Sequence, residues 1–337
     1  MNPERAQLPF CPLCTVIIPT RNGVNMLAAC LEALARQSYS RRETIVVDDG
    51  SSDGTTDLLK SYPQVKVIRL SGHAAHGFVR AANAGLAAAS GEIIMLLNND
   101  TVPDPIWLEE LISGLARNPW AGMAASKLML YSKPNFFHSA GDYYATDGVP
   151  NSRGVWQEDQ GQYNKEEEVF GPCAAAAAYR RTVLQDLARC GGSTPGGRVF
   201  DPQLWMYCED VDLNLRAWLR GHRTVYVPTA RVLHHLSATG GGTLSSYYVG
   251  RNFIYLLAKD IPWVILRRNR LRIIKAQMHF AVEALQHARE PAARARLRGM
   301  AVGLLTWPRV LGSRRRVLGS AKVSVEEFAN MLSQSNS

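Results

Sequence analysis

The sequence of 337 residues contains no run of roughly 18 to 20 consecutive apolar residues, the length that a membrane-spanning helix requires. The polar first residues are also not followed by the apolar segment of a secretory signal peptide, so we expect a cytoplasmic protein. Hydrophobic residues are nevertheless plentiful at 46%, against 20% charged residues. This composition excludes general disorder and is sufficient for one large domain or two ordinary ones.

Cysteines are few, at six in the whole chain. In a chain of this length without an export signal we interpret them as reduced thiols. Cys11 and Cys14 have CxxC spacing, but no second CxxC or histidine pair accompanies them to complete a zinc site. The cysteine pattern therefore does not support a metal centre or a redox motif.

The first three quarters of the chain carry no excess of positive charge. Residues 1–259 contain 24 Lys and Arg and 24 Asp and Glu, whereas residues 260–337 contain 14 and 5, which accounts for the whole net charge of +9. A basic segment of this kind indicates a polyanionic partner, either an anionic membrane surface or nucleic acid. The alternative is a helix face that shows its charges to water.

Short β-branched runs alternate with amphipathic stretches from about residue 14, which is typical of a mostly parallel sheet covered by helices. The pattern predicts strands at 15–18, 44–47, 65–70, 93–97 and 223–227. It predicts helices at 27–37, 78–89, 211–218, 247–259 and 263–288, followed by shorter basic helices. Between about 120 and 200 the periodicity is weaker, and we expect loops with a few strands.

Two of the predicted strands end in polar residues, at the edge where open α/β sheets bind ligands. Asp48 and Asp49 follow the second strand, where a carboxylate can accept hydrogen bonds from a nucleotide base and from ribose hydroxyls, unless it forms an ordinary Asx turn. Asp100, preceded by Asn98 and Asn99, follows the apolar strand at 93–97. A carboxylate at that point can hold a hard divalent cation, which would neutralise a diphosphate.

Two further clusters carry groups that titrate or bind metals. Glu209, Asp210 and Asp212 open a predicted helix, whose dipole favours their ionised forms. Helix capping explains Asp212 and also Glu209, whereas Asp210 is the candidate general base for removing a proton from a hydroxyl group. His234 can complete a metal site begun by Asp100, although a structural histidine is the alternative interpretation.

From about residue 15 to 260 the chain resembles the inverting glycosyltransferases of family 2, in the branch of bacterial rhamnosyltransferases and galactofuranosyltransferases. The resemblance rests on the segments VIIPTRN (16–22), IVVDDGSSDGT (45–55), EIIMLLNNDT (92–101), CEDVDLNLRAWLRGHR (208–223), ARVLHHLSATGG (230–241) and YYVGRNFIYLLAKD (247–260). It implies an α/β GT-A fold, which binds nucleotide sugars on a mostly parallel central sheet, followed here by a C-terminal helical region.

The resemblance implies a binding site for a nucleotide diphosphate sugar. By position in the family's motifs, Asp49 contacts the base and ribose, with Thr20, Asp48 and Asn99 nearby. Arg251 lies in the segment that follows the last motif, and we expect it to reach the diphosphate.

The resemblance also implies a divalent cation, Mg²⁺ or Mn²⁺, held by Asp100 and His234, with His235 as the alternative to His234. Asn98 stands at the first position of the family's DxD motif, which reduces the charge of the site. By position in the family's ED motif, the resemblance implies that Asp210 is the general base, with Glu209 as the alternative.

The predicted reaction is transfer of a sugar, with thymidine diphosphate rhamnose as the favoured donor and galactofuranose or a hexose as alternatives. The expected acceptor is a glycan or a lipid-linked glycan of cell-envelope polysaccharide synthesis. We expect residues 1–242 to form the catalytic domain. Residues 243–337 would form a basic helical region that attaches the enzyme peripherally to the inner face of the cell membrane, with no nucleic acid partner and with oligomerisation left open.

Two competing functions belong to other classes of protein. A nucleotidyltransferase would open with a Gly-rich loop containing Arg and Lys, which IIPTRNGVN (17–25) does not provide. An inactive nucleotide-sugar-binding module would be expected to lose the base, whereas Asp210 is present.

Overall fold

The computed structural model describes residues 11–72, 75–191, 197–235 and 242–334. Its strands are β1 (Cys14–Thr20), β2 (Arg42–Asp48), β3 (Lys66–Arg69), β4 (Ile93–Leu97), β5 (Thr101–Pro103), β6 (Ala121–Leu130), β7 (Lys133–Ser139), β8 (Asp142–Tyr144), β9 (Pro150–Ser152), β10 (Glu167–Val169), β11 (Ala176–Arg180) and β12 (Arg223–His234). Its α-helices are α1 (Val24–Ala35), α2 (Thr55–Lys60), α3 (Phe78–Ala88), α4 (Trp107–Arg117), α5 (Arg181–Gly191), α6 (Glu209–Leu219), α7 (Thr243–Asp260), α8 (Trp263–Gln286), α9 (Pro291–Thr306), α10 (Leu311–Gly319) and α11 (Val325–Gln334).

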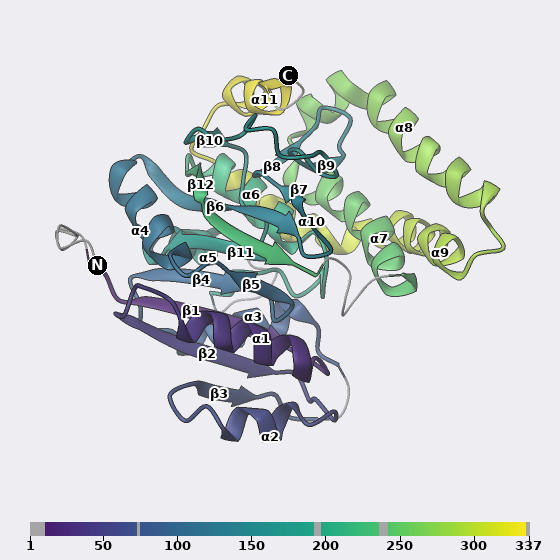
Figure 1. The fold of residues 1–337 in the computed structure, drawn as a ribbon. Coiled ribbons are helices and arrows are strands. Elements are labelled where there is room, and N and C mark those ends of the chain that lie inside the picture. Colours follow the sequence, from purple (N-terminus) through teal and green to yellow (C-terminus); the bar gives the residue numbers. More distant parts are fainter. Residues whose placement is uncertain (1–10, 73–74, 192–196, 236–241, 335–337) are drawn as a thin grey trace.

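Within these described ranges, ten strands form one central sheet (Figure 1), whose main order is β10-β12-β6-β11-β4-β1-β2-β3. The strands β3, β2, β1 and β4 are parallel to one another, and so are β6 and β12. β11 lies antiparallel between β4 and β6. The predicted α/β fold with a mainly parallel sheet is therefore confirmed, and the short antiparallel strands are an addition to it.

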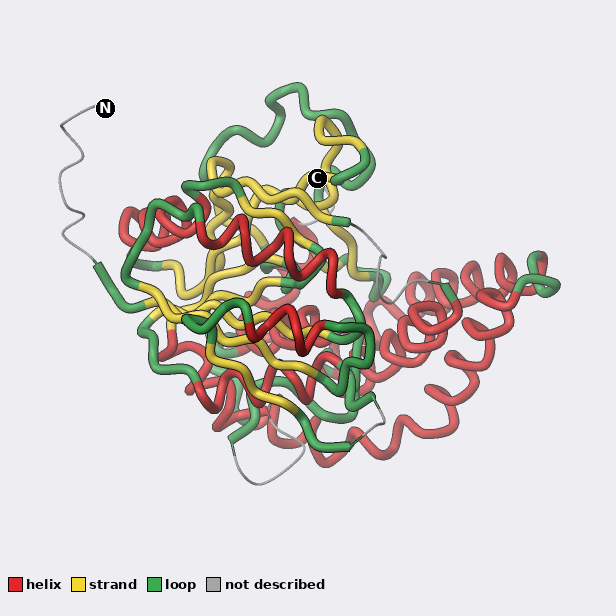
Figure 2. Tube along the Cα trace, turned by 60° about the horizontal axis from the view of Figure 1, so that its bottom comes forward, coloured by secondary structure: helices red, strands yellow, loops and turns green. Residues whose placement is uncertain are grey.

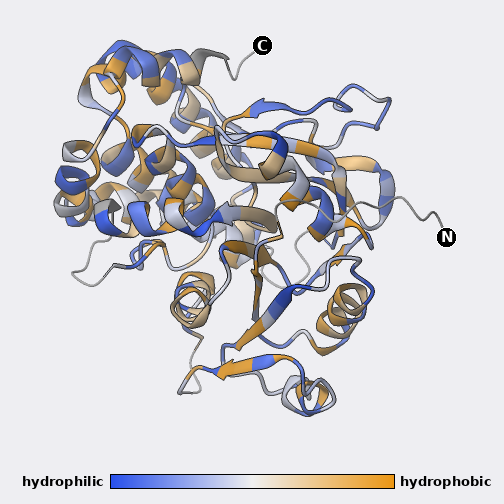
Figure 3. Cartoon of the chain, turned by 90° about the vertical axis from the view of Figure 1, so that its left-hand side faces the viewer, coloured by the Kyte–Doolittle hydropathy of each residue, from blue (hydrophilic) through white to orange (hydrophobic). Residues whose placement is uncertain are grey.

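Helices cover both faces of the sheet because successive strand residues point to opposite sides. Val16 and Ile18 pack with apolar residues of α1, α2 and α4 on one face, whereas Ile17 packs with residues of α3, α5 and α6 on the other. Figure 3 shows hydrophobic residues along the strands, between the two helical layers. Both faces of the sheet are thus buried.

The C-terminal helices form a third layer of apolar contacts. Phe253 and Leu256 of α7 are buried with residues of α6 and α11. α8 and α9 continue from this layer and extend away from the body as a pair of helices (Figure 2). Among the described residues, none of the helices combines the length and the apolar character needed to cross a membrane.

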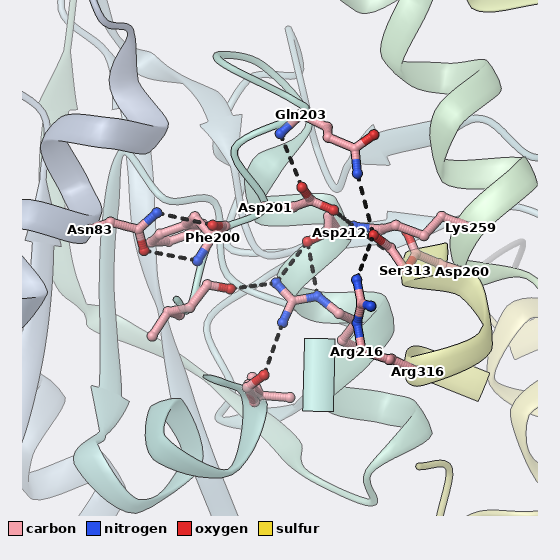
Figure 4. Close-up of polar contacts among 12 residues, drawn as sticks. Asn83, Phe200, Asp201, Gln203, Asp212, Arg216, Lys259, Asp260, Ser313 and Arg316 are labelled. Atoms are coloured by element: carbon pink, nitrogen blue, oxygen red, sulfur yellow. Dashed lines mark hydrogen bonds and ion pairs between the residues drawn. The ribbon is translucent and has the colours of Figure 1, made fainter. Parts of the chain in front are cut away.

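A buried cluster of charged side chains joins α6, α7 and the segment before α6 (Figure 4). The Lys259 ammonium lies 2.8 Å from an oxygen of Asp201 and forms a second ion pair with Asp212, while Arg216 donates to Asp212 at 2.7 Å and 2.9 Å. All four side chains are at most 1% exposed. Burial alone would lower the pKa of Lys259, but the neighbouring carboxylates raise it by more than burial lowers it. The pKa therefore lies above its ordinary value and Lys259 stays protonated.

The structure agrees with the predicted strands and helices up to residue 97 and from residue 209 onward, with differences of a few residues at their ends, except that β12 continues beyond the predicted strand at 223–227 to His234. It adds α2, α4 and β5, and it adds the strands β6 to β11 in the region where the sequence showed little periodicity. α4 had a recognisable signal, because its buried residues follow helical spacing: Trp107, Leu108, Leu111, Ile112 and Leu115. The division of the chain at residue 242 remains a prediction, although α7 packs directly against α6.

Candidate active site

The ends of β1, β2 and β4 form the edge at which the predicted nucleotide contacts lie. Asn99 donates from Nδ2 to the Thr20 hydroxyl at 3.0 Å, and the backbone N–H of Asp49 donates to the Thr20 carbonyl at 2.9 Å. Asp48 accepts from the backbone N–H of Ser51 at 2.9 Å. This is a local turn of the kind given as the alternative interpretation of the motif, and the contact of Asp48 with a nucleotide remains a prediction.

Asp49 holds the loop that leads into α3. Its carboxylate accepts hydrogen bonds from the backbone N–H groups of His76 and Gly77 at 2.8 and 3.0 Å and lies 2.7 Å from Nδ1 of His76. Gly77 has φ +83°, and a Cβ there would lie 2.6 Å from the carbonyl oxygen of Trp205. Asp49 thus fixes a glycine turn against the segment that precedes α6.

Asp100 and His234 are 134 positions apart in the sequence and meet at the sheet edge. β5 pairs with β12 so that Thr101 lies opposite His234, and Nε2 of His234 lies 3.2 Å from Oδ1 of Asp100. Both side chains are about 7% exposed or less. In the described part of the chain, Oδ1 of Asp100 is buried and has no hydrogen-bond partner. A buried carboxylate oxygen beside an imidazole nitrogen fits two ligands of a divalent cation.

His138, which the sequence did not single out, orients His234. The two Nδ1 atoms lie 3.0 Å apart, so one proton is shared between them. Burial and the neighbouring His234 lower the pKa of His138 to about 3, which keeps His138 neutral. When His234 donates from Nδ1 to His138, its Nε2 lone pair faces Asp100, as metal coordination requires.

His235, the alternative ligand, points elsewhere. Its ring stacks on Tyr131, with ring centroids 3.5 Å apart. Only its backbone N–H contacts Asp100, by donating to the Asp100 carbonyl at 2.9 Å. The geometry therefore favours His234, while residues 236–241 of the same motif lie outside the described residues.

Asp210 lies in the first turn of α6, beside the loop that carries Asp100. Its carboxylate accepts from the backbone N–H groups of Ala174 at 3.2 Å and Val211 at 2.8 Å. Burial raises the pKa of Asp210 and these hydrogen bonds oppose that change. Burial and the charge of Asp210 raise the pKa of Glu209 to about 8, so Glu209 is largely protonated at neutral pH and is the weaker candidate for a base.

Asp142 is a second residue that the sequence did not indicate. One oxygen of Asp142, one of Asp210 and Sγ of Cys173 lie within 4.8 Å of one another. Asp142 comes from β8, in the region where the sequence predicted loops. Its only signal in the sequence is an acidic residue between a glycine and two tyrosines, which is too common a pattern to identify it.

Arg251 is occupied by the protein itself. Its guanidinium donates to the carbonyl oxygens of Gln203 and Leu204, both at 2.8 Å, and lies over the rings of Tyr248 and Tyr255 at 4.7 and 5.2 Å. These contacts hold the segment that leads to α6. The contact of Arg251 with a diphosphate remains a prediction.

Asn252, next to Arg251, holds the same segment. Its Nδ2 lies 3.1, 3.0 and 2.7 Å from the carbonyl oxygens of Leu204, Met206 and Tyr207. Trp205, Tyr207 and Cys208 all have φ near +64° in this segment, a conformation that residues other than glycine adopt only when the surroundings impose it.

Comparison with known proteins assigns the chain to a family. The family model described as "Glycosyl transferase family 2" matches residues 15–188, which is more than half of the chain. The chain therefore belongs to glycosyltransferase family 2.

Several curated proteins are similar in sequence. An uncharacterized protein of Sinorhizobium fredii, y4gI, is 29% identical over 242 residues, and the O-antigen biosynthesis protein RfbC of Myxococcus xanthus is 27% identical over 238 residues; each match covers 68% of this chain. The aligned region spans only 25% and 18% of these two longer proteins. The N-acetylglucosaminyl-diphospho-decaprenol L-rhamnosyltransferase of Mycobacterium tuberculosis is 26% identical over 240 residues, covering 65% of this chain and 76% of that enzyme.

Solved structures share the fold. A mannosyltransferase of Pyrobaculum calidifontis in complex with GDP-Man and Mn²⁺ matches with a TM-score of 0.52 at 18% identity, over 94% of this chain and 88% of that one. GalNAc-T7 with UDP, GalNAc and Mn²⁺ matches with a TM-score of 0.54 at 16% identity, over 71% of this chain and 48% of that one. The architecture is the GT-A fold.

The geometry predicts how cation affinity responds to four substitutions, one at Asp100 and three at histidines. Asp100→Ala and His234→Ala should each abolish measurable Mn²⁺ binding in the presence of thymidine diphosphate, because each would remove a predicted ligand. His138→Ala should weaken binding by about 10- to 100-fold, because it removes the group that orients His234. His235→Ala is the matched control and should bind as the wild type does. Electron paramagnetic resonance of free Mn²⁺ measures all four, and wild-type affinity in His138→Ala would contradict this arrangement.

Proposed function

We propose that the protein is a metal-dependent inverting glycosyltransferase that moves a sugar from a nucleotide diphosphate donor to a hydroxyl group of a glycan. The observation that carries the proposal is the bridge between two predicted sites. Asn98 donates from its backbone N–H to the carbonyl of Ala175, and the adjacent Ala174 donates to Asp210. The loop that carries Asp100 contacts Ala175, and the proposed base Asp210 contacts Ala174. The two sites thus lie on either side of these two consecutive residues.

Tyr207 connects the same two sites. Burial raises the pKa of its hydroxyl, and the charges of Glu209 and Asp100 raise it further. The charges of Asp100 and of the start of α6 therefore both act on one side chain. This is the arrangement that a diphosphate leaving group and an acceptor hydroxyl would need on opposite sides of the transferred sugar.

In the proposed reaction Asp210 takes the proton of the acceptor hydroxyl as that oxygen bonds to the anomeric carbon. The bond from this carbon to the diphosphate breaks, and the nucleoside diphosphate leaves with the electron pair. A divalent cation, Mg²⁺ or Mn²⁺, held by Asp100 and His234 would neutralise the diphosphate. A single displacement of this kind inverts the anomeric configuration and needs no protein nucleophile. Thr20, Asp49 and Asn99 would face the nucleotide.

Thymidine diphosphate rhamnose is the donor that we favour, because a relative named as a rhamnosyltransferase aligns over 65% of this chain. Galactofuranose and hexose donors are the alternatives. Mn²⁺ and a nucleotide or nucleotide sugar are bound in both structural neighbours described above, which supports a divalent cation here. The acceptor would be a glycan or lipid-linked glycan of cell-envelope synthesis.

We further propose that α8 attaches the enzyme to anionic lipids at the inner face of the cell membrane. Its apolar stripe is uncovered, with exposed fractions of 74% for Leu271, 57% for Ile274 and Met278, and 60% for Leu285. The buried residues of this helix, Ile265 and Ala284, lie on the opposite side of it. The stripe therefore points away from the protein, with basic residues at its flanks, as in helices that lie in a headgroup layer.

Turnover by Asp210→Asn tests the catalytic assignment. Nucleotide sugars are screened for release of nucleoside diphosphate with and without a lipid-linked acceptor, and the best donor is used for the variants. Asp210→Asn should reduce kcat by about 10²–10⁴-fold, with donor affinity nearly unchanged, because it keeps the shape of the side chain but cannot accept a proton.

Chelator should abolish transfer by the wild type. Near-normal turnover in Asp210→Asn would remove the base from the scheme, and inactivity of Glu209→Gln alone would move the role by one residue. Full activity in excess EDTA would contradict the role of the cation.

Sedimentation with lipid vesicles tests the role of α8. The wild type should bind anionic but not neutral vesicles and should dissociate at high salt, because each basic residue near the surface contributes about 1 kcal/mol. Replacing five basic residues of α8 with Gln should abolish binding and preserve turnover with a soluble acceptor: Arg267, Arg268, Arg270, Arg272 and Lys275. The matched control replaces five exposed basic residues of the body: Arg36, Lys60, Lys66, Lys133 and Lys165.

The control variant should still bind. Equal binding to neutral vesicles, or no binding to either kind, would contradict the membrane proposal. A dimer that dissociates when Ile274 and Met278 are changed to Gln would then identify a second copy of the chain as the partner of this stripe.

A further inference from the structure

We propose that Asp142 is a positioning residue of the active site, whose negative charge makes Asp210 a stronger base. The inference rests on the proposed function of Asp210 and extends it to a residue that no motif contains. Asp142 acts through Asp210 and needs no contact with the substrate.

The fold holds Asp142 firmly in place beside Asp210. The β8–β9 hairpin pairs Asp142 with Ser152, and the backbone N–H of Asp142 donates to the carbonyl of Gly171 at 2.8 Å. The hydroxyls of Ser139 and Ser152 donate to Oδ1 of Asp142 at 2.9 and 2.7 Å. The side chain is only 7% exposed. Two hydroxyl donors to one oxygen stabilise the ionised carboxylate at this position.

The other titratable groups around Asp142 and Asp210 lie in β11, in the residues just before β11, and at the start of α6. Burial raises the pKa values of Cys173, Tyr179 and Cys208 well above their ordinary values, and the nearby carboxylates raise them further. These three groups are therefore neutral near pH 7. Glu209, with a pKa of about 8, is largely protonated as well.

The remaining negative charge of this part of the site lies on Asp210 and, once it ionises, on Asp142. Burial raises the pKa of Asp142 to about 7 and the charge of Asp210 contributes, while the two serines oppose the change. One oxygen of Asp142 and one of Asp210 lie within 4.8 Å of each other, and two carboxylates this close each disfavour ionisation of the other. When Asp210 takes the acceptor proton it becomes neutral, and its repulsion with Asp142 disappears. Proton transfer is therefore more favourable beside an ionised Asp142 than beside a neutral group.

The pH dependence of Asp142→Asn tests this inference. Asparagine has the same size and its Oδ1 can still accept from both serines, so only the charge is lost. In the wild type kcat/KM should increase as the pH is raised through about 7, where Asp142 ionises beside Asp210, and this increase should be absent in Asp142→Asn. The plateau should fall by about tenfold, because Asp210 is a weaker base. Donor affinity and the thermal unfolding midpoint should match the wild type.

Asp147→Asn is the matched control, since Asp147 lies in the turn of the same hairpin and its carboxylate accepts from the backbone N–H of Val149. Its pH profile should coincide with that of the wild type. An increase of kcat/KM near pH 7 that persists in Asp142→Asn would overturn the proposal, as would a loss of Mn²⁺ binding in that variant, which would identify Asp142 as a metal ligand.

A second variant tests the coupling from the other side, without relying on activity. In Asp210→Asn, the Asp142 carboxyl followed by carbon-13 NMR should titrate at lower pH than in the wild type, and an unchanged titration would also overturn the proposal. Failure of the proposed function is distinguishable, because it would appear as normal turnover in Asp210→Asn whatever the behaviour of Asp142.

Discussion

The buried ammonium of Lys259 is the group on which the arrangement of the active site depends. It neutralises Asp201 in the segment before α6 and Asp212 on α6 itself, while Arg216 forms a second pair with Asp212. Charged groups are costly to remove from water, and only a complete set of partners compensates for that cost. α6 therefore has one stable position against α7. Because Asp210 lies two residues before Asp212, this position also fixes the proposed base.

Uncharged hydrogen bonds from α7 hold the same segment before α6 that the ion pair of Lys259 holds. Asn252 is fully buried and lies within hydrogen-bond distance of three carbonyl oxygens between residues 204 and 207. Three residues there have left-handed backbone conformations, which cost about 1–3 kcal/mol each unless the surroundings require them. Trp205 in turn contacts Gly77, whose N–H donates to Asp49. The segment thus links the predicted nucleotide contacts with the base, and α7 is part of that link.

The sequence was informative where chemistry follows a long, periodic element. Asp100 and His234 could be paired in advance because each follows an apolar strand and the family's motifs contain both. His138 and Asp142 could not, because they come from short strands in a region of weak periodicity, and only the sheet register brings them to the site. Ala176, Ala177 and Ala178 lie in the central strand β11 although alanine favours helices, since sheet packing outweighs local propensity. The diphosphate contact of Arg251 stays a prediction, and what the structure adds is that carbonyl groups and tyrosine rings contact its guanidinium.

The unfolding free energy of Lys259→Met tests most directly whether this buried cluster determines the arrangement of the site. Methionine preserves the volume but leaves Asp201 and Asp212 buried without their ammonium partner. The account predicts a loss of about 3–5 kcal/mol together with faster hydrogen exchange in residues 201–211. Lys60→Met, at a lysine that is 72% exposed, should change stability by less than about 0.5 kcal/mol. A Lys259→Met protein with wild-type stability and wild-type exchange in this segment would contradict the account.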